Sequence, residues 1–505
     1  NASIGINSVS LTNVNANAQA LTPLYLQKVK ALADTFRPYG IQVFLTARFS
    51  APIEIGGLST ADPLDENVAK WWKQKAEEIY SLIPDFGGFL VKANSEGQPG
   101  PQNYNRNHAD GANMLAKALA PFGGDVIWRA FVYSEFDNTD RAKQAYNEFV
   151  PLDGQFEENV IIQIKNGPID FQPREPFHPL FGAMLKSHIG MEFQITQEYL
   201  GFGTHLAYLP ALFSEVLKSQ TFKNNKTVAD LLVSKTPSKS LIAGVANIGS
   251  ELNWTMHPFG QANWYGFGKL AWNPDADVEQ IAKEWIASTL TKEPSAISKI
   301  TQMMLESREA VVNYTGSLGL HHLFDTGHHY GPGPWVSNLS RPEWNPTYYH
   351  QADENGIGFD RTLSGSNATA QYAVELQKRW NNPEDCPEEL LLWFHHLPWN
   401  YELTSGVSLW EQLTLNYQQG VEDIERFQKT WQSVSPHIHP QLFKQVEMLL
   451  SIQYDEALWW KDASISYFQQ FSKQGLPQGV EPPLHDLNHY QSLKFPFAPG
   501  TRPSW

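Results

Sequence analysis

The sequence predicts an α/β fold, a (β/α)8 TIM barrel followed by a mainly α-helical C-terminal domain. In the first half of the chain, short apolar runs alternate with segments of helical apolar spacing. Eight such runs are found, and strands separated by helices form parallel sheets because parallel neighbours need a long crossover. After Val278 the pattern changes to helical segments alone. We therefore expect a barrel over residues 1–278 and a helical domain over 279–505.

The eight expected strands are short and mostly apolar. In chain order they are 6–11, 41–46, 89–92, 126–132, 160–165, 191–196, 241–246 and 264–272. Helices are expected between them at 24–36, 67–82, 111–119, 141–149 and 209–217. The rival architecture is an open doubly wound sheet, but the Gly-rich phosphate-binding turn that usually follows one of its strands is not found. Eight strand–helix units over this length favour the closed barrel.

The second half of the sequence is expected to be helical, with one long irregular segment. Helical spacing is found at 281–290, 296–309, 371–380, 390–396, 410–431 and 442–471. The segment 321–360 is rich in Gly, Pro, His and aromatic residues and shows little regular pattern. It is therefore expected to form a loop region.

The chain is acidic, and this excludes some partners. Its net charge is −16 with a pI near 5.5. A nucleic-acid-binding protein needs a basic face, so no nucleic-acid partner is expected. No apolar run approaches the length of a membrane span, so no span is expected. An acidic chain repels an acidic polysaccharide at long range, so a few local cations in a pocket must hold any acidic substrate.

Charged residues follow the expected strands at the ends where barrel enzymes carry their sites. Lys92 and Glu96 follow the third strand, Arg129 lies in the fourth, Lys165 and Asp170 follow the fifth, Glu198 follows the sixth, and Glu251 and Trp254 follow the seventh. Each charge alone is more simply explained as a solvated loop charge or a surface ion pair. Together they are harder to dismiss, because three of them are cations close to apolar strands. Such cations need an anionic partner, which is either one of these carboxylates or an anionic ligand.

This combination suggests glycoside hydrolysis. The reaction needs a protonated carboxylic acid for the leaving oxygen and a carboxylate that acts on water or on the sugar. A cationic pocket beside these groups would hold a sugar acid, since Arg offers a bidentate fork to a carboxylate and Lys a point charge. Aromatic residues make up 13% of the chain, and their flat faces suit sugar rings as well as core packing.

Several long segments together closely resemble the family 67 glycoside hydrolases, the α-glucuronidases of xylan breakdown. The first is 87–101, Gly-Gly-Phe-Leu-Val-Lys-Ala-Asn-Ser-Glu-Gly-Gln-Pro-Gly-Pro. Others are 108–113, 126–133, 151–154, 163–168, 194–199, 328–335 and 356–362. The resemblance implies an inverting enzyme that hydrolyses the α-1,2 bond between (4-O-methyl)-glucuronic acid and the terminal xylose of xylo-oligosaccharides from glucuronoxylan.

The resemblance also implies roles for the six strand-end residues. Glu96 matches the general acid, and Asp170 and Glu198 match the carboxylates that hold and activate water, with the choice of base between them left open. Lys92, Arg129 and Lys165 match the cations around the glucuronic carboxylate. The carboxyls of acid and base would stand about 6.5–9.5 Å apart. The loop region 321–360 is expected near the active site. Trp254 and Trp335 are further candidates for sugar contact, although Trp335 is as readily explained by packing.

Other implications concern the rest of the molecule. Family members carry an N-terminal β-rich domain, which this chain is expected to lack because it begins at about the first barrel strand. The helical C-terminal domain resembles one used for dimerisation, so a homodimer is expected. The location stays open between cytoplasm, periplasm and cell envelope in a bacterium, and secretion in a fungus. No cofactor is implied. The pairs His321-His322 and His328-His329 fit no standard zinc spacing, so no metal site is expected.

Two alternatives remain. A retaining barrel glycosidase for neutral sugars would need carboxyls about 5–5.5 Å apart and would leave the three cations unexplained. A non-catalytic carbohydrate-binding protein would need an aromatic platform but not three strand-end carboxylates.

Overall fold

The computed structural model describes residues 1–12, 14–132, 137–233, 239–247, 257–325 and 329–493. The chain forms two compact units. The first contains Asn1–Pro168, Phe177–Glu192 and Ser219–Ala243, and the second contains Ile169–Pro176, Phe193–Lys218 and Gly244–Trp505. The chain passes from one unit to the other after its fifth strand and again within the sixth and ninth strands. The expected division at residue 278 stays a prediction.

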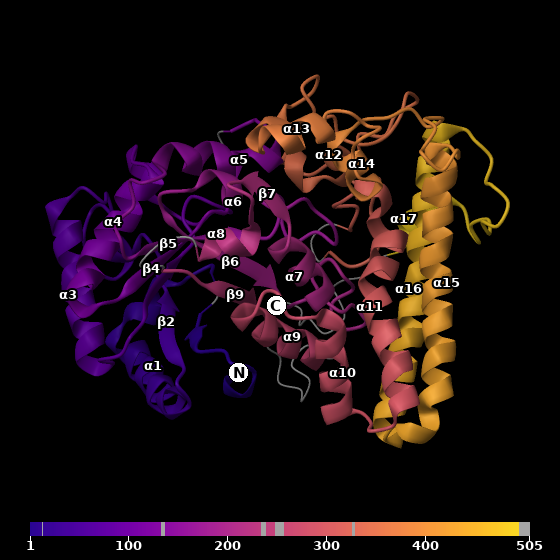
Figure 1. Ribbon diagram of the computed structural model, residues 1–505. Coiled ribbons are helices and arrows are strands. Elements are labelled where there is room, and N and C mark those ends of the chain that lie inside the picture. The colour runs from indigo at the N-terminus through magenta and orange to yellow at the C-terminus, as the bar shows by residue number, and fades with distance from the viewer. Residues whose placement is uncertain (13, 133–136, 234–238, 248–256, 326–328, 494–505) are drawn as a thin grey trace. The chain divides into compact units, whose positions relative to one another are not determined.

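A curled sheet of seven strands is built from the first half of the chain (Figure 1). Its strands, in sheet order, are β1 (Ser8–Ser10), β2 (Gln42–Thr46), β3 (Gly88–Val91), β4 (Asp125–Arg129), β5 (Val160–Lys165), β6 (His188–Gln194) and β9 (Ile242–Val245). Each of the first five strands pairs in parallel with the next. The backbone N–H of Met191 donates to the carbonyl of Leu241 at 2.9 Å, next to β9. Seven of the expected strands are therefore confirmed.

Helices of the first unit bury apolar side chains, and the helices Pro23–Phe36 and His108–Leu119 contact strands of this sheet. The unit contains α1 (Pro23–Phe36), α2 (Ala51–Glu54), α3 (Glu66–Leu82), α4 (His108–Leu119), α5 (Arg141–Phe149), α6 (Leu180–Ala183), the hairpin β7 (Gln220–Lys223) and β8 (Lys226–Thr227), and α8 (Val228–Leu232). The Asp65 side chain caps α3 by accepting from two backbone N–H groups, and the helix buries Trp72 and Ile79. Every residue of β5 is buried, as is typical of a parallel strand covered on both faces.

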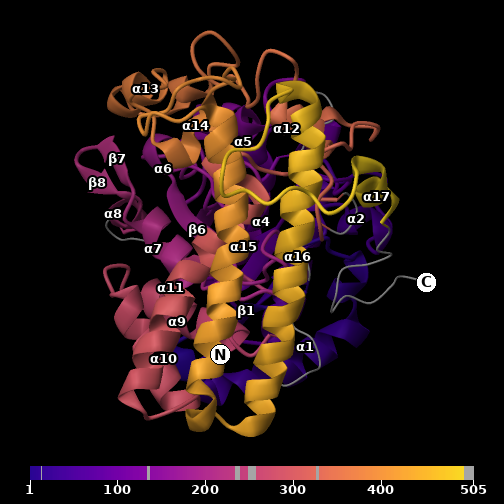
Figure 2. The same cartoon turned by 90° about the vertical axis from the view of Figure 1, so that its right-hand side faces the viewer.

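The second unit is mainly helical, as the sequence predicts. Its helices are α7 (Pro210–Leu217), α9 (Gly260–Trp272), α10 (Val278–Thr289), α11 (Pro294–Gly316), α12 (Pro346–His350), α13 (Val374–Trp380), α14 (Leu391–Phe394), α15 (Leu409–Val434), α16 (Pro440–Ser472) and α17 (Leu487–Ser492). Helices α15 and α16 lie side by side over most of their length (Figure 2). Near their turn Trp431 stacks on Phe443, with ring planes 5° apart. None of the described helices combines the length and apolar character that a membrane crossing needs.

The expected strand at 264–272 is wrong, because this segment lies in helix α9. Asn263, Phe267 and Leu270 are buried at helical spacing, but the polar Asn263 hides that period in the sequence. Its amide accepts from the backbone N–H of Leu209 at 2.9 Å and donates to the carbonyl of Ala207 at 3.0 Å. A buried polar side chain is tolerated there because it satisfies the backbone of a neighbouring segment.

Candidate active site

The predicted cations and carboxylates occupy two kinds of place along the sheet. Arg129 and Lys165 are the last residues of β4 and β5, and Lys92 comes directly after β3. All three are buried, with 4% of each residue exposed. The carboxylates come four or five residues beyond a strand end, Glu96 after β3, Asp170 after β5 and Glu198 after β6. The sheet therefore carries the cations, and the loops that follow it carry the carboxylates.

In the first unit, Lys92 is paired with Glu96. The Lys92 ammonium contacts the Glu96 carboxylate and also donates to Asn15 Oδ1 at 2.9 Å. Burial lowers the pKa of Lys92, and although Glu96 opposes this, the charges of Arg129 and Lys165 add to it. The side chain of Glu96 is 39% exposed. Its backbone lies in the left-handed region with φ +48°, a conformation that costs energy for a residue with a side chain.

Arg129 is held by a carboxylate that the sequence analysis did not single out. Its guanidinium grips both carboxylate oxygens of Glu192 on β6, with Nε 2.8 Å from Oε2. Gln163 on β5 donates to the same carboxylate. Burial alone would raise the pKa of Glu192, but the charges of Arg129 and Lys165 and these hydrogen bonds hold it below its usual range. Arg129 is therefore fixed in orientation by a buried bidentate pair.

The cations converge on one aromatic ring in the first unit. Among the described residues, four cationic groups lie within 6 Å of the centre of the Phe131 ring: Lys165 at 3.5 Å, Arg141 at 5.2 Å, Arg129 at 5.4 Å and Lys92 at 5.7 Å. Burial and the charges of Arg141 and Lys165 lower the pKa of the nearby His178 to about 3, so that imidazole is neutral. The structure thus brings together the three predicted cations and adds Arg141, the first residue of α5.

In the second unit, Asp170 lies on a short loop held by its own side chains. The Glu175 carboxylate accepts from the backbone N–H groups of Ile169 and Gln172, each at 2.7 Å. The Gln172 side-chain oxygen Oε1 accepts from the backbone N–H of His322 at 2.7 Å. Phe171, next to Asp170, has φ +52°. These hydrogen bonds fix a strained turn, and the turn sets the direction of the Asp170 side chain.

Glu198 is held from two sides in the same unit. Gln194, the last residue of β6, donates to Glu198 Oε2 at 2.8 Å, and its own Oε1 accepts from the Glu198 backbone N–H at 3.2 Å. His329 Nδ1 lies 2.9 Å from Oε1. The His329 ring stacks on Tyr199 with centroids 4.8 Å apart. The Tyr199 hydroxyl donates to Asp170 Oδ2 at 3.5 Å. The second unit thus links Asp170 and Glu198 through His329 and Tyr199.

The remaining candidates divide into described and undescribed residues. Trp335 is half-buried and meets Tyr467 edge-on, with centroids 6.3 Å apart, which is a packing contact. Trp254 and Glu251 lie outside the described residues, as does His328. Burial lowers the pKa of His321, whose Nδ1 lies 3.0 Å from the carbonyl of Gly319. Over the described residues, no group of three or more His, Cys, Asp or Glu is arranged to hold a metal ion.

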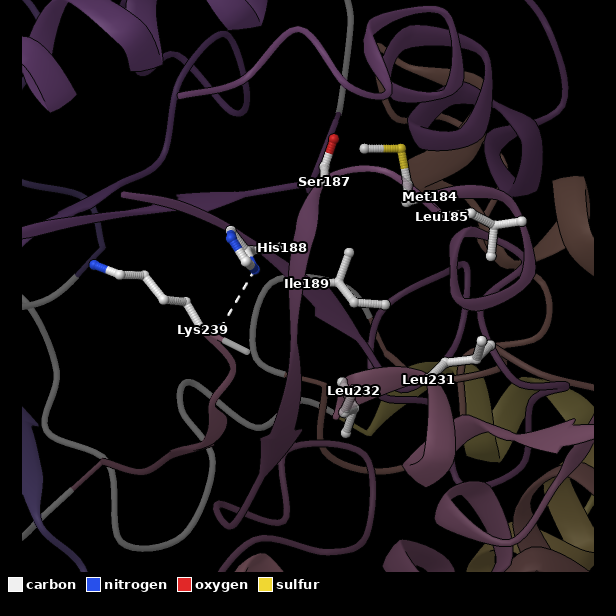
Figure 3. Close-up of a pocket in the computed structure, with 8 residues that line it drawn as sticks. All are labelled: Met184, Leu185, Ser187, His188, Ile189, Leu231, Leu232 and Lys239. Carbon is white, nitrogen blue, oxygen red and sulfur yellow. Dashed lines mark hydrogen bonds between the residues drawn. The ribbon is translucent and has the colours of Figure 1, made fainter. Parts of the chain in front are cut away.

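One small cavity of the first unit lies at the other end of β6 (Figure 3). It is lined by Met184, Leu185, Ser187, His188, Ile189, Leu231, Leu232 and Lys239. Its volume is about 10 Å³, which is room for no more than one water. His188 begins β6 and accepts from the backbone N–H of Lys239 at 3.4 Å, so the cavity is at the end of β6 opposite Gln194. It is part of the packing beneath the sheet and no candidate for a substrate site.

Sequence reasoning missed Glu192, Arg141, Tyr199 and the role of His329. A signal existed for Glu192, because a lone Glu between Met191 and Phe193 in an apolar strand needs a buried cation. In the sequence, His329 is recognisable only as half of a His-His pair and as part of the resembling segment 328–335. Its contact with Glu198 joins residues 131 positions apart, and no local pattern predicts such a contact.

Comparisons with known proteins agree with the resemblance. Residues 1–254 match the family model of the glycosyl hydrolase family 67 middle domain, and residues 255–481 match that of the family 67 C-terminus. An alpha-glucuronidase of Hypocrea jecorina is 41% identical over 481 residues, which cover 93% of this chain and 56% of that protein. Alpha-glucuronidase A of Emericella nidulans is 41% identical over 490 residues, covering 94% and 57%. A probable alpha-glucuronidase A of Aspergillus niger is 39% identical over 488 residues, with the same coverage.

The chain spans a little over half the length of these curated relatives. The two family models follow one another without a gap and together account for residues 1–481. On this basis the chain belongs to glycosyl hydrolase family 67.

Proposed function

We propose that this chain is the catalytic barrel and helical C-terminal part of an inverting α-glucuronidase. Its substrate would be a xylo-oligosaccharide from glucuronoxylan, whose terminal xylose carries (4-O-methyl)-glucuronic acid in an α-1,2 bond. The observation that carries the proposal is the cluster of Lys92, Arg129 and Lys165 around Phe131 in a protein of net charge −16. The names of the relatives at about 40% identity support the same activity.

The cation cluster suits a sugar acid. A buried positive centre compensates the cost of removing a carboxylate from water, which a neutral sugar would not require. Arg129 donates from Nε and Nη2 to Glu192, and this ion pair orients it before any ligand binds. Groups that are already oriented lose little freedom when a ligand binds. The cluster therefore favours a uronic acid over the neutral substrates of a retaining barrel glycosidase.

The reaction proposed is a single displacement. Glu96 gives its proton to the glycosidic oxygen as the bond from the anomeric carbon to that oxygen breaks, which leaves the xylose hydroxyl. Water forms the new bond to the anomeric carbon from the opposite face and gives its proton to Asp170 or Glu198. Exchange of one proton with solvent restores both groups. Glu198 is held by hydrogen bonds to Gln194 and His329, and Asp170 accepts one from Tyr199, which supports a role in orienting water.

Further parts of the proposal concern the remaining predictions. Trp335 and Trp254 would contact sugar, and the loop region 321–360 would contribute to the site through His329. The chain would act without a cofactor and form a homodimer through its helical C-terminal region. Light scattering of the purified chain tests the last point, with a monomer mass of 57.1 kDa as the result that overturns it.

The anomer that is released first tests the mechanism. Proton NMR within minutes of mixing the chain with aldobiouronic acid is expected to show β-glucuronic acid, which then mutarotates. If the α-anomer forms first, the reaction is retaining and the roles given to Asp170 and Glu198 are wrong. If no glucuronic acid is released, the proposed activity is wrong for this chain.

A further inference from the structure

The hydrogen bond between His329 and Glu198 defines the orientation of that carboxylate. Gln194 holds Oε2 at 2.8 Å and His329 Nδ1 holds Oε1 at 2.9 Å, so each oxygen has its own donor. A carboxylate gripped at both oxygens cannot turn about its last bond without losing one of them. Because Gln194 ends β6, one of these donors is fixed by the sheet and the other by a distant loop.

The His329 ring is itself held in place. It stacks on Tyr199 with 26° between the ring planes. The Tyr199 ring in turn meets the Phe324 ring edge-on, with centroids 5.3 Å apart. The backbone N–H of His329 donates to the carbonyl of Asp325 at 3.1 Å. Its φ of +58° lies in the left-handed region, which is uncommon for residues other than Gly, although His adopts it more often than most. Such strain persists where the surroundings over-determine a conformation, and it is concentrated at functional sites.

The loop that follows the ring is anchored in the second unit. The Tyr330 hydroxyl lies 3.4 Å from Thr204 Oγ1 and bonds to Glu456 on α16. A Cβ at Gly331 would lie 2.1 Å from the Trp459 ring, so the backbone there is pressed against α16 and cannot carry a side chain. The ring of His329 is therefore held by the core of the helical unit and not only by its neighbours in the loop.

We propose that His329 is a positioning residue for Glu198, and that the stack of His329 on Tyr199 makes Glu198 and Asp170 one coupled pair. This inference rests on the proposed function, in which these carboxylates orient and activate water. Among the described residues, His329 faces the ionisable groups Glu198 and Tyr199 from the loop after β6. It also faces His322 from its own loop, with ring centroids 6.0 Å away. Asp170 lies beyond Tyr199.

Two variants separate a positioning role from a merely structural one. His329→Leu removes the donor. His329→Asn keeps an N–H donor near the place of Nδ1, tolerates the left-handed backbone and cannot ionise. On aldobiouronic acid, kcat of H329L is expected to fall about 100-fold with KM little changed, since a misplaced catalytic group costs that much. H329N is expected to recover most of this loss, because it keeps a donor to the Glu198 carboxylate.

The matched control is His437→Leu, at an exposed histidine in the turn between α15 and α16. It is expected to keep wild-type kinetics. Thermal unfolding of each variant checks the fold. The proposal is overturned if H329L matches wild type in kcat and pH profile, or if folded H329N is as slow as H329L.

A measurement without turnover keeps this test apart from that of the proposed function. NMR of histidines labelled at Cε1 follows the ionisation of His329, whose resonance is identified by its loss in H329N. Replacing Glu198 with Gln is expected to shift the titration midpoint of His329 to lower pH, because an anionic neighbour favours the protonated ring. An unchanged midpoint would overturn the inference, whether or not the chain hydrolyses any substrate.

Discussion

The cation cluster of the first unit and the carboxylate network of the second are built differently. Lys92, Arg129 and Lys165 leave the sheet at or next to strand ends and are 4% exposed. Glu198 and His329 stand on loops, with 32% and 27% of their side chains exposed. The cations are fixed by burial and by Glu192, whereas the carboxylates are fixed by hydrogen bonds to side chains on loops and at a strand end, some of them far away in the chain.

This difference indicates how one fold can assign substrate binding and proton transfer to different kinds of position. A cation that binds a carboxylate should keep its charge and its position, and attachment to the rigid sheet keeps its position fixed. A group that takes or gives protons must exchange them with solvent, which a partly exposed loop permits.

Replacing Glu96 with Gln is expected to lower kcat on aldobiouronic acid about 1,000–10,000-fold, because the leaving xylose then departs without a proton. Glu96 belongs to the first unit, like the cations, but it lies on a loop, like the other carboxylates. This variant therefore tests whether the groups that transfer protons are those on loops. With an aryl α-glucuronide, whose leaving group needs no proton, the fall in kcat should be far smaller. Equal losses on both substrates would show that Glu96 serves binding.

Arg129 tests the rigidity of the cation cluster, since its partner Glu192 is a fully buried carboxylate. Arg129→Met leaves Glu192 in the core without its cation and is expected to lower the free energy of unfolding by about 3–5 kcal/mol. The double variant R129M/E192M removes both charges and should recover most of that loss. Urea unfolding measures both. If the single variant is as stable as wild type, the cation cluster is not the rigid element described above.

Glu456 tests how the helical unit supports the carboxylate network. Burial raises the pKa of Glu456 to about 7, with a smaller contribution from Asp455, while the hydrogen bond from Tyr330 opposes the rise. A carboxyl with a raised folded pKa stabilises the fold fully below its unfolded pKa near 4.5 and loses that contribution as pH rises to 7. The free energy of unfolding should therefore fall by about 3 kcal/mol over this window.

Glu456→Gln should remove that fall, because a neutral amide keeps the same charge at every pH. Melting temperatures of the two proteins are compared at pH 5 and pH 8. The variant is expected to match wild type at the lower pH and exceed it at the higher. A parallel fall in both proteins would mean that other groups set the pH dependence.

The sequence predicts the cation side of the site better than the carboxylate network. Strands such as β5 are mainly apolar and fully buried, so their ends, and with them Lys165 and Arg129, follow from local pattern. The carboxylates could be named because they follow the same strands by a short offset. Glu192 reaches Arg129 across β5, and this depends on the parallel register in which Arg129 pairs with Gln163 and Lys165 with Glu192. A register is not visible in one strand alone.

The contacts of His329 lie further beyond sequence reasoning. They depend on the packing of a loop whose nearest charged partner, Glu198, is distant in the chain. Helix α9 was mistaken for a strand for a related reason, since buried Asn263 is satisfied by the backbone of another segment. In both cases a polar side chain has its partner far away in sequence, and local periodicity carries no trace of that partner.

The smallest effect is expected for Tyr199→Phe, which separates the two contacts that Tyr199 makes. The variant keeps the aromatic face on which His329 stacks, and it loses only the hydroxyl that reaches Asp170 at 3.5 Å. A bond of that length is weak, so kcat should fall about 5-fold, the equivalent of about 1 kcal/mol. Tyr199→Leu also removes the stack and should approach the loss seen in H329L. If Phe is as damaging as Leu, the hydroxyl carries the coupling; if neither matters, the two carboxylates act independently and the hydrogen bonds to Glu198 alone define its place.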